Sequence, residues 1–284
     1  MIKSKYKLFE LFNIPIYVDI SFAILLLFFV TSQGSLFSGF AWAIALAVSV
    51  VAHELAHSLT ARAFGYRTND ITISLLGGCA SLIALPRKAW QEFMTAFAGP
   101  FMSFMLAVLA IAMIGVIGDG SALDLTWRCM RGGVSIGASH KLYLYFFMIG
   151  DDVIYTCSKG MFLLVDVLLN FACMNLWLGL FNLLPGFPMD GGRIFRSAMI
   201  TFMSRSKATL VAMWVGRVFA IVLGLSGLYS IFNGGSWGFV RILIAWMIWN
   251  EGWREYQMAL VEERFSNWQQ ADFNAKVSPP PYDR

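Results

Sequence analysis

Two histidines and a glutamate stand close together in an otherwise apolar stretch of this sequence. The stretch reads SVVAHELAHSLTARAFG, and within it His53, Glu54 and His57 form the pattern HExxH. Residues four apart lie on one face of an α-helix, so the two imidazoles point the same way, one turn apart. Two imidazoles in this arrangement can bind one Zn²⁺, and the adjacent glutamate can reach a water molecule beside it. The pattern therefore predicts metal-assisted hydrolysis, with Glu54 as the general base.

The HExxH pattern supplies only two of the three protein ligands that a catalytic zinc usually has. The third histidine of the chain, His140, lies in a loop that we expect on the other side of a membrane. Asp190 is the better candidate, because prolines before it and glycines after it break a helix and let a carboxylate turn inward. Alone, Asp190 would be read as a turn residue. Beside HExxH, the sequence predicts that His53, His57 and Asp190 together hold Zn²⁺.

The composition indicates that these residues belong to a membrane protein. Of the 284 residues, 58% are hydrophobic and 13% are charged, whereas an average soluble domain has about 25% charged residues. Spans of about 20 residues are needed to cross a bilayer. The candidates are Ile14–Gln33, Phe37–Leu59, Phe93–Ile117, Met161–Leu184, Leu210–Phe232 and Trp237–Trp253. We therefore expect an all-α polytopic membrane protein with about six transmembrane helices.

The positions of lysine and arginine predict the orientation of the chain in the membrane. With the amino terminus in the cytoplasm, most basic residues fall in cytoplasmic segments, and few fall outside. We therefore expect both termini in the cytoplasm of a prokaryotic cell, and the HExxH end of the second span toward the cytoplasmic side. The basic residues are scattered and the net charge is only +4, so no nucleic-acid partner is expected.

Two connecting segments depart from the helical pattern. The segment Ile71–Leu85 is too short to span, is rich in β-branched residues and is interrupted by two glycines. It is either a short β-ribbon or re-entrant segment, whose edge could accept another chain, or an ordinary loop. The polar loop 118–160 contains LYLYFFMIG, which we interpret as an interfacial or re-entrant piece. Cys129 and Cys157 in this loop could pair if it faces an oxidising compartment.

Two motifs together resemble a known family. HELAH in the second span and NLLPGFPMDGG after a later span resemble HExxH and NxxPxxxxDG, the signature motifs of the site-2 protease family of intramembrane zinc metalloproteases. The segment AFAGP at Ala96–Pro100 and the glycines Gly77 and Gly78 are also similar to that family, and the likeness runs from about Ile14 to Trp253.

The resemblance implies a role for each matching residue. It implies that His53, His57 and Asp190 bind Zn²⁺ and that Glu54 is the catalytic base. It also implies that Asn182, in the NxxP part of the second motif, positions substrate or steadies the oxyanion. Asn175, seven residues earlier, matches the family less closely.

The resemblance also implies a function and a domain plan. The function is zinc-dependent endopeptidase activity on transmembrane or membrane-proximal segments of single-span substrates, in regulated intramembrane proteolysis, with a regulatory membrane protein as a further partner. We expect a metalloprotease domain over residues 1–255 and a short, partly disordered cytoplasmic tail over 256–284, without the PDZ or CBS domains of many members.

Three alternatives remain open at this stage. Intramembrane histidine and aspartate also line ion pathways, so a metal-ion carrier is the alternative from another class, although a carrier has no need for Glu54. An inactive relative that only binds transmembrane helices is a second alternative. A different HExxH membrane protease, with a glutamate as its third ligand, is the third.

Overall fold

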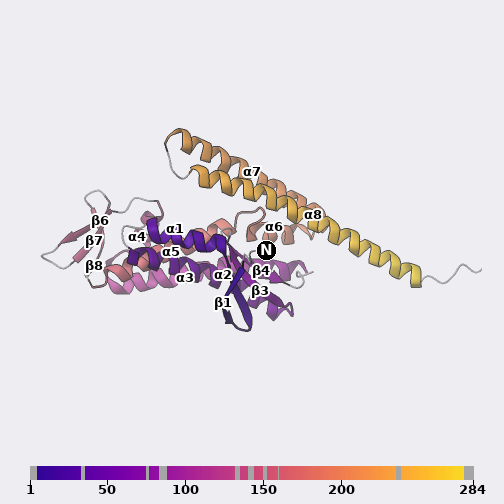
Figure 1. Cartoon of the computed structure of the whole chain (residues 1–284), viewed down its shortest axis with the longest axis horizontal. Helices are drawn as coiled ribbons and strands as arrows, with labels where there is room; N and C mark the ends of the chain where they lie inside the picture. Colours follow the sequence, from indigo (N-terminus) through magenta and orange to yellow (C-terminus); the bar gives the residue numbers. More distant parts are fainter. Residues whose placement is uncertain are drawn as a thin grey trace, which may run out of the picture. The chain divides into compact units, whose positions relative to one another are not determined.

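The computed structural model describes residues 5–32, 36–74, 77–82, 88–131, 135–139, 144–149, 152–158, 160–234 and 238–277 (Figure 1). Contacts divide the chain into two compact units. Unit 1 comprises Met1–Pro86 and Phe97–Phe181, and unit 2 comprises Arg87–Ala96 and Asn182–Arg284. Helices account for most of the described residues, and two small β-sheets accompany them. The all-α expectation was therefore correct for most of the described residues, but it did not include the two β-sheets.

Among the described residues, four helices are long and apolar enough to cross a membrane. They are Gly39–Ala63 within α2 (Leu36–Ala63), α3 (Ala89–Ile117), α5 (Phe162–Asn182) and α7 (Arg205–Phe232). These correspond to the second to fifth spans expected from the sequence. The first and sixth expected spans are not among them, so a count of six stays a prediction.

The first expected span differs because its beginning is a β-strand. Strand β2 (Ile14–Asp19) precedes α1 (Ile20–Ser32), which has 13 residues and is therefore about 20 Å long, shorter than the hydrocarbon core of about 30 Å. The sixth expected span lies in α8 (Gly238–Val277). Arg241 near its start, with the charged residues from Glu251 onward, leaves α8 without a long uncharged stretch.

The ribbon predicted after the second span is confirmed as part of a larger sheet. Strand β3 (Thr68–Ser74) pairs antiparallel with β4 (Gly77–Leu82) and parallel with β2, which pairs antiparallel with β1 (Lys5–Leu11). The strand order is β1-β2-β3-β4, so β4 is an edge strand.

Alternating burial explains why the segment of β2 forms a strand. Ile14 and Ile16 are buried, while the residues between and after them are half-buried, which is the period of two expected of a strand with one face on a core. Their buried face packs with Ile71 and Ile73 of β3 and with Val50 of α2. The sheet therefore rests on α2 one turn before His53.

The segment 118–160 contains a second sheet and a short helix. Strand β5 (Asp119–Gly120) and helix α4 (Ala122–Met130) precede β6 (Ser135–Ser139), β7 (Leu144–Ile149) and β8 (Asp152–Ser158), in sheet order β5-β8-β7-β6. Residues 144–149 of LYLYFFMIG form strand β7, which pairs with β6 and β8. An interfacial position of this piece stays a prediction.

The side chain of Tyr155 connects this segment to α3. Tyr155 Oη donates a hydrogen bond of 2.6 Å to the carbonyl of Ile114, and burial raises the pKa of Tyr155 to about 12. The phenol therefore remains a neutral donor at physiological pH.

Cys129 and Cys157 are free thiols, so the pairing considered from the sequence is not observed. His140 lies outside the described residues.

Unit 2 contains the start of α3, up to Ala96, and three further helices. Helix α6 (Asp190–Met199) leads into α7, and α7 and α8 pack against each other as an antiparallel pair (Figure 1). Helix α8 continues to Val277, so most of the segment expected as a tail is helical. The disorder predicted for the end of the chain falls largely on residues 278–284, outside the described residues.

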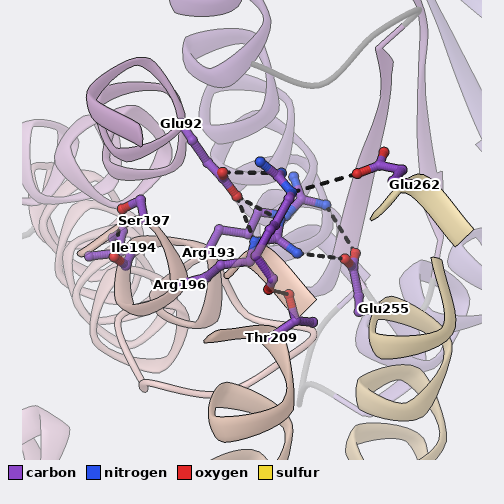
Figure 2. Close-up of polar contacts among 9 residues, drawn as sticks. Glu92, Arg193, Ile194, Arg196, Ser197, Thr209, Glu255 and Glu262 are labelled. Atoms are coloured by element: carbon purple, nitrogen blue, oxygen red, sulfur yellow. Dashed lines mark hydrogen bonds and ion pairs between the residues drawn. The ribbon is translucent and has the colours of Figure 1, made fainter. Parts of the chain in front are cut away.

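An ionic network with a buried centre, called the charge cluster below, joins the helices of unit 2. Its members are Glu92, Arg193, Arg196, Arg205, Glu255 and Glu262 (Figure 2). Arg196 and Glu92 form its centre, with side chains 2% and 5% exposed and Nη2 2.6 Å from Oε1. Arg205 Nη2 lies 3.1 Å from Glu92 Oε2, and Arg196 Nη1 lies 3.3 Å from Glu255 Oε2. Three arginines thus face three glutamates.

Candidate metal centre

The two histidines of HExxH lie on one buried face of α2, as the spacing predicted. His53 is 3% exposed and His57 is 9% exposed. Their ring centroids are 4.8 Å apart, at an interplanar angle of 79°, and one ligand nitrogen from each ring lies within 4.8 Å of the other. Two rings this close and this differently oriented can direct one nitrogen each toward a common point.

Ser103 of α3 holds the ring of His53. The Nδ1 atom of His53 forms a buried hydrogen bond of 2.9 Å with Ser103 Oγ. A metal-binding histidine almost always donates its second ring N–H to a fixed acceptor, which sets the tautomer and the ring orientation. With Ser103 Oγ accepting from Nδ1, the nitrogen that remains for a metal is Nε2.

Gly99 of α3 provides the space next to both Nε2 atoms. A Cβ built on Gly99 would overlap Nε2 of His57 and would lie 2.6 Å from Nε2 of His53. Both separations are shorter than those of real Cβ contacts, so any residue other than glycine at this position would have to displace the two imidazole rings. Gly99 and Ser103 are four residues apart on α3 and therefore share a face, as the two histidines do on α2.

This arrangement fits a zinc ion. Zinc in proteins prefers imidazole nitrogen and carboxylate oxygen ligands, and the Nε2 side of both rings faces a position that carries no side chain. His53, His57 and Asp190 are each buried and each offers one ligand atom. The two buried imidazoles of α2 are donors of the kind that zinc prefers.

Glu54 follows His53 directly and is also buried, with 8% of its surface exposed. The sequence places a carboxylate one residue from a ligand of the candidate metal, in an apolar helix where an isolated charge is costly. This is the position that a general base of an HExxH site occupies.

Asp190 lies in unit 2 as the first residue of α6. A carboxylate is stabilised there, because the amino-terminal turn of a helix carries a partial positive charge. The two glycines that follow it allow a close approach of backbones: a Cβ on Gly191 would overlap the carbonyl of Leu184, and one on Gly192 would lie 2.7 Å from the carbonyl carbon of Gly186. The loop before Asp190 is thus packed directly on α6, as the expected break between two helices requires.

Asn182, in the second motif, and Asn175, seven residues before it, differ in their surroundings. Asn182 is the half-buried last residue of α5. Asn175 is completely buried and donates hydrogen bonds to Ser49 Oγ of α2, at 2.8 Å, and to the carbonyl of Phe171, at 2.9 Å. Asn175 therefore ties α5 to α2 one turn before His53, which is a positioning role.

Ser103 and Gly99 are the site residues that the sequence did not single out. A signal was present, since Gly99 belongs to the AFAGP segment and a serine follows it four residues later. The pairing with His53 is a tertiary contact across 50 positions, and no local pattern encodes it.

Comparisons with known proteins agree with this site. The model of "Peptidase family M50" matches residues 41–223, which is more than half of the chain. A putative zinc metalloprotease of Synechocystis is 32% identical over 287 residues, covering 95% of this chain and 64% of the relative. A zinc metalloprotease of Methanocaldococcus jannaschii is 28% identical over 264 residues, covering 92% of this chain and 63% of the relative. The chain thus spans less than two thirds of the length of these two relatives.

The solved structure of a site-2 protease from Methanocaldococcus jannaschii has the same fold. It superimposes with a TM-score of 0.58 at 25% identity and covers 89% of this chain and 95% of that chain. The fold and the candidate spans define an integral membrane protein with the fold of a site-2 protease. The chain belongs to peptidase family M50, and its resemblance to site-2 proteases is confirmed.

Proposed function

We propose that this protein is an intramembrane zinc metalloendopeptidase that hydrolyses a peptide bond in or near the transmembrane segment of a membrane protein. The observation that carries the proposal is the buried HExxH face of α2, with His53 held by Ser103 and Gly99 leaving room at the Nε2 atoms. Membership of family M50 supports it.

The proposed zinc ligands are His53, His57 and Asp190. When bound, Zn²⁺ lowers the pKa of a water molecule toward about 7 and polarises a carbonyl. Support for Asp190 comes from its place in the NxxPxxxxDG motif and from its burial at the start of α6.

Glu54 and Asn182 carry the remaining steps in this proposal. Glu54 accepts a proton from the attacking water and donates it to the amine that leaves, so the carboxylate is restored after each cycle. Asn182 offers an amide N–H to the oxyanion that forms on the scissile carbonyl. Removal of one such donor typically costs a factor of about 10²–10³ in kcat.

The edge strand β4 is the proposed contact for an unwound substrate. The order β1-β2-β3-β4 leaves one side of β4 without a neighbouring strand in its sheet, and an extended segment can add to such an edge through backbone hydrogen bonds. A helical substrate must unwind before its carbonyl is accessible, and a strand partner stabilises the extended form.

We place the protein in a prokaryotic cell membrane with both termini and the catalytic face toward the cytoplasm. The distribution of lysine and arginine supports this orientation. The proposed partners are a single-span substrate and a regulatory membrane protein.

Replacement of Glu54 by glutamine tests the proposal. Glu54→Gln keeps the shape of the side chain and removes its basicity, so purified protein should retain zinc while cleavage of a model transmembrane substrate falls to background. Asp190→Ala should lose zinc as well as activity. A Glu54→Gln protein that cleaves at the wild-type rate would refute the assigned role. Zinc flux across vesicles without any cleavage by the wild type would instead favour a carrier.

A further inference from the structure

Arg217 is a charged residue within an apolar membrane helix. It lies 12 residues after Arg205 in α7, which places it about 18 Å along the helix. Helix α7 is one of the four candidate spans. A charged side chain at such a position is costly and usually has a partner or a function.

Three tryptophan rings lie close to the guanidinium of Arg217. Its Cζ lies 4.5 Å from the ring centroid of Trp249, 5.0 Å from that of Trp214 and 5.5 Å from that of Trp253. The ring faces attract the cation. They accept no strong hydrogen bonds, so they do not replace the water that the five N–H donors of an arginine lose on burial.

The Nε donor of Arg217 has no acceptor among the residues that the structure describes. This Nε atom is buried, and within the same described ranges no carboxylate pairs with the guanidinium. The arginines of the charge cluster, in the same unit, all face glutamates. The nearby Glu251 pairs with Arg254 at 2.9 Å.

An open cavity of about 390 Å³ lies beside this guanidinium. Its lining consists of Arg217, Trp249, Asn250 and Trp253. The polar groups that these side chains can offer are a guanidinium, two indole N–H groups and an amide, which are mainly donors. Such a set favours an anion with several acceptor oxygens, and an arginine is well suited to a phosphate.

The position of the cavity favours a lipid as the source of that phosphate. Tryptophan is enriched where membrane helices meet the polar headgroups, and Trp249 and Trp253 flank the point where α8 becomes charged, at Glu251. Basic pockets between membrane helices at this level bind anionic headgroups.

We propose that Arg217, Asn250, Trp249 and Trp253 form a binding site for the phosphate of an anionic phospholipid. Arg217 contacts the phosphate oxygens, Asn250 donates its amide N–H, and the tryptophans flank the headgroup. The site lies entirely within unit 2 and contains none of the proposed catalytic residues.

Native mass spectrometry of the full-length protein tests the proposal. Protein released from micelles with equal amounts of phosphatidylglycerol and of diacylglycerol with the same acyl chains, which lacks the phosphate, should retain phosphatidylglycerol with a preference of about tenfold, the value of one charged hydrogen bond. Arg217→Gln should lose this preference. Arg254→Gln is the matched control, because Arg254 is a nearby but exposed arginine, and it should keep the preference.

Two further measurements separate the alternatives. Asn250→Ala changes an exposed side chain and should reduce the preference several-fold even if Arg217→Gln does not fold; unchanged zinc content and melting temperature would show that the fold is intact. Equal retention of both lipids by the wild type, or an unchanged preference in Arg217→Gln or Asn250→Ala, would overturn the proposal. Displacement of phosphatidylglycerol by millimolar inorganic phosphate would overturn the lipid assignment and indicate a site for a soluble anion.

Discussion

Helix α3 contributes to two buried polar regions that differ in what their side chains contact. In the charge cluster, Glu92 faces Arg196 and Arg205, and each charge has an opposite charge nearby. In the histidine face of α2, Ser103 binds His53 through Nδ1, and Gly99 keeps the Nε2 side of both rings clear of side chains. In the charge cluster the protein itself supplies the opposite charges, whereas the histidine face is arranged for a ligand, the metal ion, that comes from outside the chain.

The two regions should also differ in which property of the protein a substitution changes, stability or metal binding. Removing one partner of a buried ion pair leaves an uncompensated charge, so the charge cluster is expected to respond through stability. Changing Gly99 or Ser103, which shape and orient the histidines, alters few contacts of the fold. Such a change is therefore expected to lower the affinity for zinc. The predictions below test this separation.

The largest effect is expected for Gly99→Ala. The added Cβ overlaps Nε2 of His57, so purified protein should contain no stoichiometric zinc and should lack proteolytic activity. Metal content per protein is the measurement. Gly115→Ala is the matched control on the same helix, because its Cβ would meet only Ala122, at 3.8 Å, and should leave zinc unchanged. Full zinc in Gly99→Ala would mean that the metal does not lie on the Nε2 side of the rings.

The next largest effect is expected for Glu92→Gln, and it should appear in stability. Loss of this carboxylate leaves Arg196 and Arg205 without their shared partner, which should lower the free energy of unfolding by about 3–5 kcal/mol. Chemical unfolding of the solubilised protein measures it. Glu251→Gln, which breaks the Glu251–Arg254 pair on the outside of α8, should cost less than about 1 kcal/mol. Similar losses in both variants would contradict the distinction between buried and exposed pairs.

The smallest effect is expected for Ser103→Ala, and it should appear in metal affinity. Loss of the acceptor for Nδ1 of His53 should weaken zinc binding about 10- to 100-fold, measured by competition with a chromophoric chelator. A shifted absorption spectrum of the cobalt-substituted protein would report the altered ring. Thr126→Ala removes a buried hydroxyl that bonds only within its own helix and should leave the affinity unchanged. Equal affinities in Ser103→Ala and the wild type would show that Ser103 does not orient His53.

The parts of this molecule that the sequence predicted are those with a local signal. The spacing of His53 and His57 places them on one helix face in any α-helix, and the glycines and prolines around Asp190 mark a helix break without reference to the rest of the chain. The β3–β4 hairpin was also predictable from its β-branched residues and its glycines. Such features depend on residues close in sequence.

The missed parts lack such a local signal. All seven residues of β1 are exposed, so they show no alternation of burial. Only Asp19 and Ser21 interrupt the apolar residues between β2 and α1, so the sequence does not separate the strand from the helix. The contact of Ser103 with His53 and the pairing of Glu92 with Arg196 join positions 50 and 104 residues apart. Only the folded chain brings these residues together.

Helix α3 also fixes an angular relation between Gly99 and Ser103. The two residues are four positions apart, and at about 100° per residue they lie within about 40° of each other around the helix. A single residue inserted between them would turn Ser103 by about a further 100° away from the side of Gly99, although every side chain would be retained. The spacing along α3 is therefore as much a requirement of this protein as the identity of the residues themselves.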